Sequence, residues 1–159
     1  MRWRNGAAVC AAVLALTLSF AAGAVQSADG NDQALLADAD YAGGLVALKA
    51  GDVAGALQRF QSAQKRFPDA ANLHNELGYA YRKLGQFDKA FEHYKRALAI
   101  DPRHRGAHEY IGEAYLLVGD VASAQRHLMA LRSICLLPCD ELDELQRAID
   151  AQHAQSKPR

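Results

Sequence analysis

The sequence has no excess of charge of either sign, because its 159 residues carry 18 lysine and arginine and 18 aspartate and glutamate side chains. Without a basic surplus, nothing in the composition argues for a nucleic-acid partner, and no acidic tail argues for a basic one. Half of the residues are hydrophobic and 23% are charged, which is ordinary for a globular chain. The length and composition fit one modest domain.

Motifs for catalysis and cofactor binding are missing as well. The chain has no Gly-x-Ser-x-Gly nucleophile motif, no Gly-x-x-x-x-Gly-Lys phosphate loop and no His-Glu-x-x-His metalloprotease pattern. It also lacks the Cys-x-x-Cys spacing of thiol oxidoreductases and the Cys-x-x-Cys-His site of haem attachment. We therefore expect no enzyme activity, no cofactor, no metal site and no small-molecule substrate.

Only the beginning of the chain has a long uncharged run. Residues 7–22 contain no charged side chain, Arg2 and Arg4 precede them, and the small residues Ala22-Gly23-Ala24 follow. This order is typical of a secretory signal peptide, which we place at residues 1–24. An uncleaved anchor is the alternative, although a membrane span needs about 20 apolar residues. We therefore expect an exported, periplasmic protein that meets a membrane only if this segment is retained.

What the sequence does contain is a fixed period of 34 residues. Small residues repeat at this step in three columns: Gly44, Gly78 and Gly112; Gly51, Gly85 and Gly119; Ala56, Ala90 and Ala124. Apolar residues recur between these columns at intervals of three and four, as they do on one face of a helix. The pattern predicts helix pairs in three abutting repeats, residues 37–70, 71–104 and 105–138.

The second repeat shows the pattern best. Gly78 and Tyr81 belong to its first helix, and Gly85 ends that helix because glycine tolerates the left-handed turn. A second helix is predicted from Phe87 and stops before Pro102, since proline cannot continue a helix. Each of these residues therefore has a structural role in a helical hairpin.

The outer repeats depart from the pattern. The first has Gly43 and Gly44 side by side, and each costs about 1 kcal/mol relative to alanine in a helix, so its leading helix is predicted to be the least stable. In the third, Leu128 stands where the second has an aromatic residue, and the closing proline is delayed to Pro138. Atypical terminal repeats are common because they cap the stack.

Three segments flank the repeats. Residues 139–151 predict a capping helix, apolar toward the third repeat and polar toward water. Its apolar stripe consists of Leu142, Leu145 and Ile149. Residues 25–36 are predicted to be a flexible lead-in, and residues 152–159 a disordered tail.

These columns resemble the tetratricopeptide repeat (TPR) family, and with the leading segment the chain resembles small exported TPR proteins of bacteria. The resemblance implies an all-α, right-handed solenoid of three helix pairs plus a capping helix. It also implies a protein–protein interaction module that binds a peptide or a partner helix in a concave groove, supporting an envelope complex. Family members that bind heat-shock-protein tails hold a carboxylate with basic residues. Tyr41, Leu45, Glu109 and Glu113 are wrong for that function.

The family's groove is lined by the first helix of each repeat. Carried over to this chain, the groove positions are Tyr41, Leu45, Asn72, Asn75, Tyr79, Arg82, Lys83, Glu109, Glu113 and Leu116. Tyrosine and arginine are enriched at binding hot spots, so Tyr79 and Arg82 are the leading candidates. Alternatively, Arg82 pairs with Glu113 or Glu109 across repeats.

Two cysteines and three histidines leave further alternatives open. Cys135 and Cys139 are four residues apart with Pro138 between them, which favours a disulfide between the third repeat and the cap. A redox-active or soft-metal pair, or two reduced thiols, are the alternatives, and with them a periplasmic redox or metal-handling accessory protein. A self-associating structural protein is a further alternative. A metal site at His104, His108 and His127 is also conceivable, because His104 and His108 lie one helical turn apart.

Overall fold

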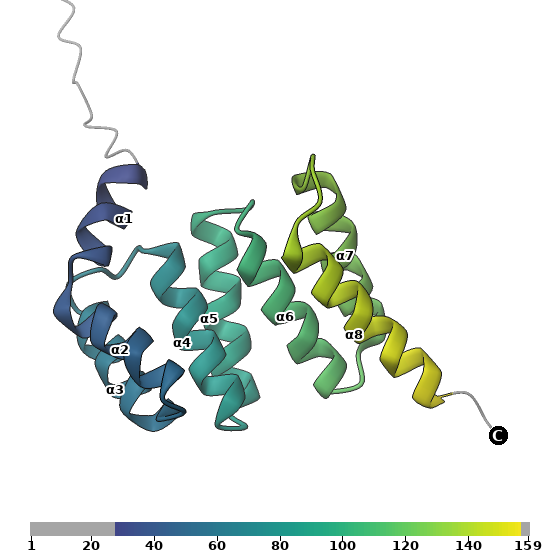
Figure 1. Cartoon of the computed structure of the whole chain (residues 1–159), viewed down its shortest axis with the longest axis horizontal. Helices are drawn as coiled ribbons and strands as arrows, with labels where there is room; N and C mark the ends of the chain where they lie inside the picture. Colours follow the sequence, from purple (N-terminus) through teal and green to yellow (C-terminus); the bar gives the residue numbers. More distant parts are fainter. Residues whose placement is uncertain (1–27, 157–159) are drawn as a thin grey trace, which may run out of the picture.

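The computed structural model describes residues 28–156, which form eight helices and no strand (Figure 1). The helices are α1 (Ala28–Leu36), α2 (Ala39–Lys49), α3 (Val53–Gln64), α4 (Ala71–Lys83), α5 (Phe87–Ile100), α6 (Arg105–Leu117), α7 (Val121–Ile134) and α8 (Asp140–Ser156). None of these helices is long and apolar enough to cross a membrane. The signal peptide expected at residues 1–24 lies outside the described residues.

Consecutive helices pack as hairpins, α2 with α3, α4 with α5 and α6 with α7, and α8 packs against both α6 and α7. Figure 1 shows the first helices α2, α4, α6 and the final α8 on one side, with the second helices α3, α5 and α7 behind them. The prediction of an all-α solenoid of three helix pairs with a capping helix is confirmed.

Glycine makes the turn inside every hairpin. Gly51, Gly85 and Gly119 have φ values of 80°, 72° and 82°, a left-handed conformation that costs other residues steric strain. In each turn the amide after the glycine reaches five residues back, as in the 2.9 Å bond from Gln86 N–H to the Tyr81 carbonyl. These bonds satisfy the last carbonyls of the first helix and return the chain.

Small residues let the helices of a hairpin approach closely. Gly44 lies against the Phe60 ring, and a methyl group on Gly78 would lie 2.6 Å from the Tyr94 ring. Gly112 is different, because a methyl group there would lie 2.6 Å from Cδ2 of Leu145 on α8. The cap therefore contacts the glycine column that an aromatic side chain of the same hairpin contacts in the first two repeats.

Two segments are more ordered than the sequence predicted. The flexible lead-in of residues 25–36 is wrong from Ala28 onward, because α1 forms there and buries Leu35, which is 1% exposed, in the main core. The disordered tail of residues 152–159 is wrong as far as Ser156, because α8 continues to that residue. Once a helix is nucleated, extending it is easy, and no glycine or proline interrupts this stretch before Pro158.

Candidate functional site

The expected groove residues lie on α2, α4 and α6, the first helices of the three hairpins, but they differ in accessibility. Four of them are less than 10% exposed: Tyr41, Asn75, Glu109 and Leu116. Leu116 belongs to the core that the third hairpin shares with α8, and Tyr41 packs on Phe60 with 5.8 Å between ring centroids. Direct contact with a partner therefore falls to the other expected residues.

The centre of this face is a cluster of aromatic and charged side chains on α4 and α6. Arg82 donates from Nη1 to Oε2 of Glu113 at 2.8 Å, and its side chain is 10% exposed. Its guanidinium lies 5.3 Å from the ring centroid of Tyr79 and 5.5 Å from that of Tyr110. Lys83 Nζ lies 5.5 Å from the Tyr79 ring. The geometry realises the alternative in which Arg82 pairs with Glu113, so Tyr79 and Lys83 are the more accessible contacts.

Glu109 lies beneath the capping helix rather than in an open groove. It is 4% exposed, and its carboxyl shares a hydrogen bond with Glu144 of α8. Burial, this bond and the neighbouring carboxylates of Glu113, Glu144 and Glu141 raise its pKa well above the ordinary value. A protonated Glu109 can donate to Glu144, which joins α6 to α8.

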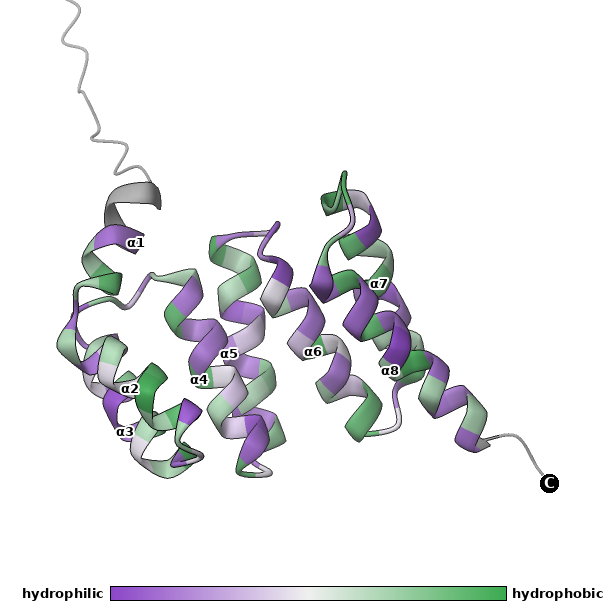
Figure 2. Ribbon diagram, viewed as in Figure 1, coloured by the Kyte–Doolittle hydropathy of each residue, from purple (hydrophilic) through white to green (hydrophobic). Residues whose placement is uncertain are grey.

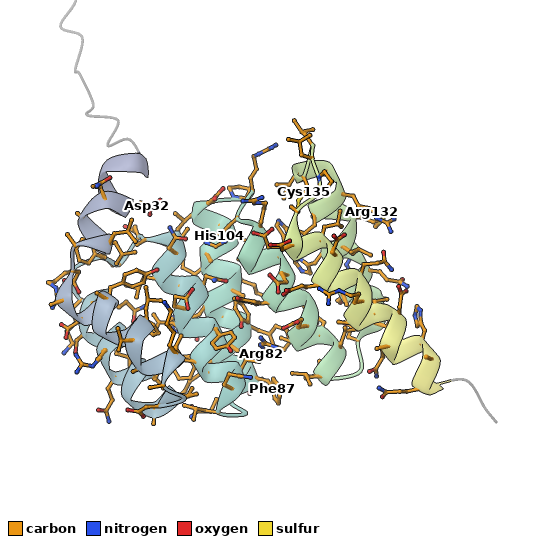
Figure 3. The ribbon with its side chains drawn as sticks, in the orientation of Figure 1. Asp32, Arg82, Phe87, His104, Arg132 and Cys135 are labelled. Carbon is orange, nitrogen blue, oxygen red and sulfur yellow. A yellow bond between two sulfur atoms is a disulfide. The ribbon has the colours of Figure 1, made fainter. Side chains whose placement is uncertain are left out.

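The capping helix also forms a wall that the sequence did not predict. A pocket of about 290 Å³ lies between α8 and the lower ends of α4 and α6, where Figure 3 labels Arg82. Its lining is Arg82, Glu113, Leu116, Leu117, Ala148, Ala151, Gln152 and Gln155. Leu117 is 62% exposed, so the pocket has an apolar rim that an apolar side chain could contact.

Histidines bridge the helices of the second and third hairpins in the same way. Nδ1 atoms face each other at 3.0 Å between His74 and His93, and at 2.9 Å between His108 and His127. Nε2 of His74 donates to the Pro68 carbonyl at 2.9 Å, so its Nδ1 must accept from His93. His108 makes the corresponding bond at 3.1 Å to the carbonyl of the proline 34 residues later.

These bonds also account for the histidines that were considered as metal ligands. Both ring nitrogens of His108 are used, and those of His104 contact the Asn72 side chain and the Ala107 amide, each at 3.1 Å. In the part of the chain that the structure describes, no group of three or more His, Cys, Asp or Glu side chains is placed to hold a metal ion. The histidines join helices instead.

The two cysteines lie at the connection between α7 and α8. Their sulfur atoms are 1.98 Å apart, and their Cα atoms are 6.1 Å apart. The loop between them carries Leu136 and Leu137, which are 89% and 80% exposed. Figure 2 shows this apolar connection projecting beyond the ends of the helices.

Comparisons with known proteins agree with this architecture. Two profiles described as tetratricopeptide repeat match residues 41–105 and 81–134, which together cover more than half of the chain. The chain belongs to the tetratricopeptide repeat family. It is also 35% identical over 81 residues to the protein CTR9 homolog of Arabidopsis thaliana, a match that covers 51% of this chain and 7% of that protein.

Solved structures of TPR domains share the fold at low sequence identity. The TPR2B domain of yeast Sti1, in a complex with an Hsp70 peptide, has a TM-score of 0.66 at 20% identity, covering 79% of this chain and 98% of that one. The first TPR of Spaghetti (RPAP3), bound to the HSP90 peptide SRMEEVD, scores 0.65 at 18%, covering 76% and 97%. The type III secretion translocator chaperone SycD of Yersinia enterocolitica scores 0.65 at 18%, covering 83% and 98%. Members of this fold thus bind peptides in some proteins.

Proposed function

We propose that this TPR protein is a non-enzymatic binding module, which holds a peptide segment or a partner helix along α4 and α6. The observation that carries the proposal is the Tyr79, Tyr110 and Arg82 cluster, whose rings and guanidinium are already fixed by mutual contacts. Rigid aromatic anchors lose little conformational entropy on binding, which makes them effective hot spots. The apolar pocket beside α8 extends the same surface.

We further propose that the protein is exported and acts in the bacterial cell envelope. The support is the basic, apolar and small-residue order of residues 1–24, together with two cysteines whose sulfur atoms lie at bonding distance. A disulfide persists in an oxidising compartment, so the two features agree. An N-terminal sequence of the protein purified from the envelope tests the export proposal, since cleavage predicts a chain that begins at Val25.

Replacing Tyr79 and Lys83 together by alanine is expected to lower partner capture at least tenfold while helicity stays unchanged, because both side chains lie on the accessible side of the cluster. Arg82 is kept, since removing it would leave Glu113 without its ion-pair partner. The measurement is crosslinked pull-down from envelope extract, followed by titration with the partner identified. Met129→Ala on α7, where the side chain is 59% exposed, is the control. Equal capture by the double variant would show that the groove is misplaced.

The disulfide is expected to stabilise the protein only modestly. A bond that closes a loop of about five residues restricts the unfolded chain by about 2 kcal/mol in the chain-entropy account. The double variant Cys135→Ser, Cys139→Ser should lower the free energy of unfolding by that amount in urea titrations, and reductant should have no further effect on it. Rapid alkylation of both thiols in protein taken directly from the envelope would contradict a structural bond and favour the redox alternative.

A further inference from the structure

Glu76 is a partly buried carboxylate on this face with no cationic partner. It lies in α4 between two expected groove residues and accepts a 3.3 Å hydrogen bond from Nδ2 of Asn75. None of the ion pairs made by residues 32–155 includes it, although Glu113, one helix away, is paired with Arg82. Burial raises the pKa of Glu76 to about 6, which shows that its charge is poorly solvated.

The surroundings of Glu76 are aromatic. Its charge contributes to the raised pKa values of Tyr41 on α2, Tyr94 on α5 and Tyr110 on α6, so the carboxylate lies within electrostatic reach of all three rings. Tyr94 is fully buried, whereas Tyr110 is partly exposed. A cation that approached Glu76 would therefore meet the ring of Tyr110 as well as a carboxylate.

A second unsatisfied acceptor lies beside this carboxylate. Asn75 is 5% exposed, and its Oδ1 has no hydrogen-bond partner even though Nδ2 is used by Glu76. The amide lies between α4 and the first turn of α6, since a methyl group on Gly106 would be 3.5 Å from Nδ2. A buried carbonyl oxygen without a donor is costly, and a donor from a bound molecule would remove that cost.

The charge at the upper end of the same face has the same sign. Asp32 of α1 acts on both Tyr41 and His104, and it forms no ion pair with the described residues. Figure 3 shows Asp32 and His104 together above α4, and Arg82 at the opposite end. The two acids near the upper end thus have no basic neighbour at ion-pairing distance.

The protein itself shows what such a combination binds. At the lower end, Glu113 with the rings of Tyr79 and Tyr110 holds the guanidinium of Arg82. Glu76, Asn75 and Tyr110 offer a carboxylate, a free carbonyl oxygen and an aromatic ring without a cation. We infer that Glu76, Asn75 and Tyr110 form a receptor for a lysine or arginine side chain of the bound segment, a specificity that rests on the proposed function.

The site is tested first without any peptide. Butylammonium, which mimics a lysine side chain, is titrated into isotopically labelled protein, with butanol as the neutral probe of the same shape. Butylammonium should shift the amide signals of residues 75–77 and lower the pKa of the Glu76 carboxyl, because a cation stabilises the carboxylate. Butanol should do neither. If the two probes give equal shifts, or if the Glu76 pKa stays where it is, the receptor is wrong.

Blocked pentapeptides with a central lysine, arginine or glutamine then test the link to binding. The basic peptides should bind at least fivefold more tightly than the glutamine peptide, and Glu76→Gln should abolish that preference. Glu92→Gln, which changes an exposed carboxylate of α5, should keep it. Equal binding of all three peptides to the α4 and α6 face would refute the receptor and leave the proposed function standing. If the amine probe meets its expectation but no peptide shifts this face, the cation site stands and the peptide-binding function is wrong.

Discussion

Replacing Leu145 by alanine is expected to lower the free energy of unfolding by about 3 kcal/mol, within the range for a buried leucine. Leu145 is fully buried and fills the space beside Gly112, where a methyl group would lie 2.6 Å from its Cδ2. The third hairpin cannot fill this space itself, because its aromatic position is occupied by Leu128. Removing the Leu145 side chain therefore leaves a cavity between α6 and α8, which urea titration should report.

Leu142→Ala is the matched control for this prediction. Leu142 lies on the same helix and the same apolar stripe, but it is only partly buried, so its loss should cost clearly less. Hydrogen exchange gives the second measurement, because the amides of α8 should lose protection in Leu145→Ala while those of α4 and α5 keep it. Equal losses in the two variants would mean that α8 is held by its whole face and not by this one contact.

The repeat columns made most of the fold predictable. Glycine at a left-handed turn and glycine beneath an aromatic ring act within one hairpin, so a single sequence carries the information at each occurrence. Leu145 could also be assigned to an apolar stripe from its spacing. The partner of that stripe could not be predicted, because Gly112 contacts it across a boundary where the period ends.

The site was less predictable for the same reason. Asn75 and Glu109 occupy groove positions of the family, yet both are buried here. Glu109 is covered by α8, and no repeat column reports on a helix outside the repeat. Glu76 and Tyr110 carried no signal, since an isolated acid or tyrosine on a helix is ordinarily solvated. Their importance follows from which neighbours they have, and which they lack.

Acid is expected to destabilise the protein through the two histidine pairs. Burial and the partner ring lower the pKa of His93 and of His127 to about 4, against about 6.5 for an ordinary histidine. Between these pH values the unfolded chain binds more protons than the folded one, so the free energy of unfolding falls as the pH is lowered from about 6.5 to about 4. A loss of about 2 kcal/mol per pair is expected, less than full burial would give.

The charged neighbours of each pair set the size of this effect. Glu92 favours and Arg96 disfavours a proton on the first pair, where Asp69 also faces His74. Arg126 beside His127 disfavours a proton on the second pair, which has no acidic counterpart among the groups that act on that ring. The second pair should therefore be the more acid-sensitive of the two.

Other groups titrate nearby with the opposite sign. Glu76 and Glu109 have raised pKa values, so the folded protein binds more protons at these sites and acid stabilises it there. Asp38 and Asp120, with lowered pKa values, contribute stability that is lost only as the pH falls below about 4. The overall slope of stability with pH is thus a sum, and the histidine part must be isolated by difference.

The double variant His93→Gln, His127→Gln isolates it. Glutamine keeps a neutral donor for the Nδ1 atoms of His74 and His108, but it cannot take up a proton in this range. The difference in unfolding free energy between the wild type and this variant should be constant above pH 7 and should decline by about 2 kcal/mol per pair between pH 6.5 and 4. A difference that does not change with pH would show that the rings are bridged without any coupling to acid. A decline confined to His127→Gln among the single variants would assign the effect to the third hairpin, the one that already relies on α8 for its core.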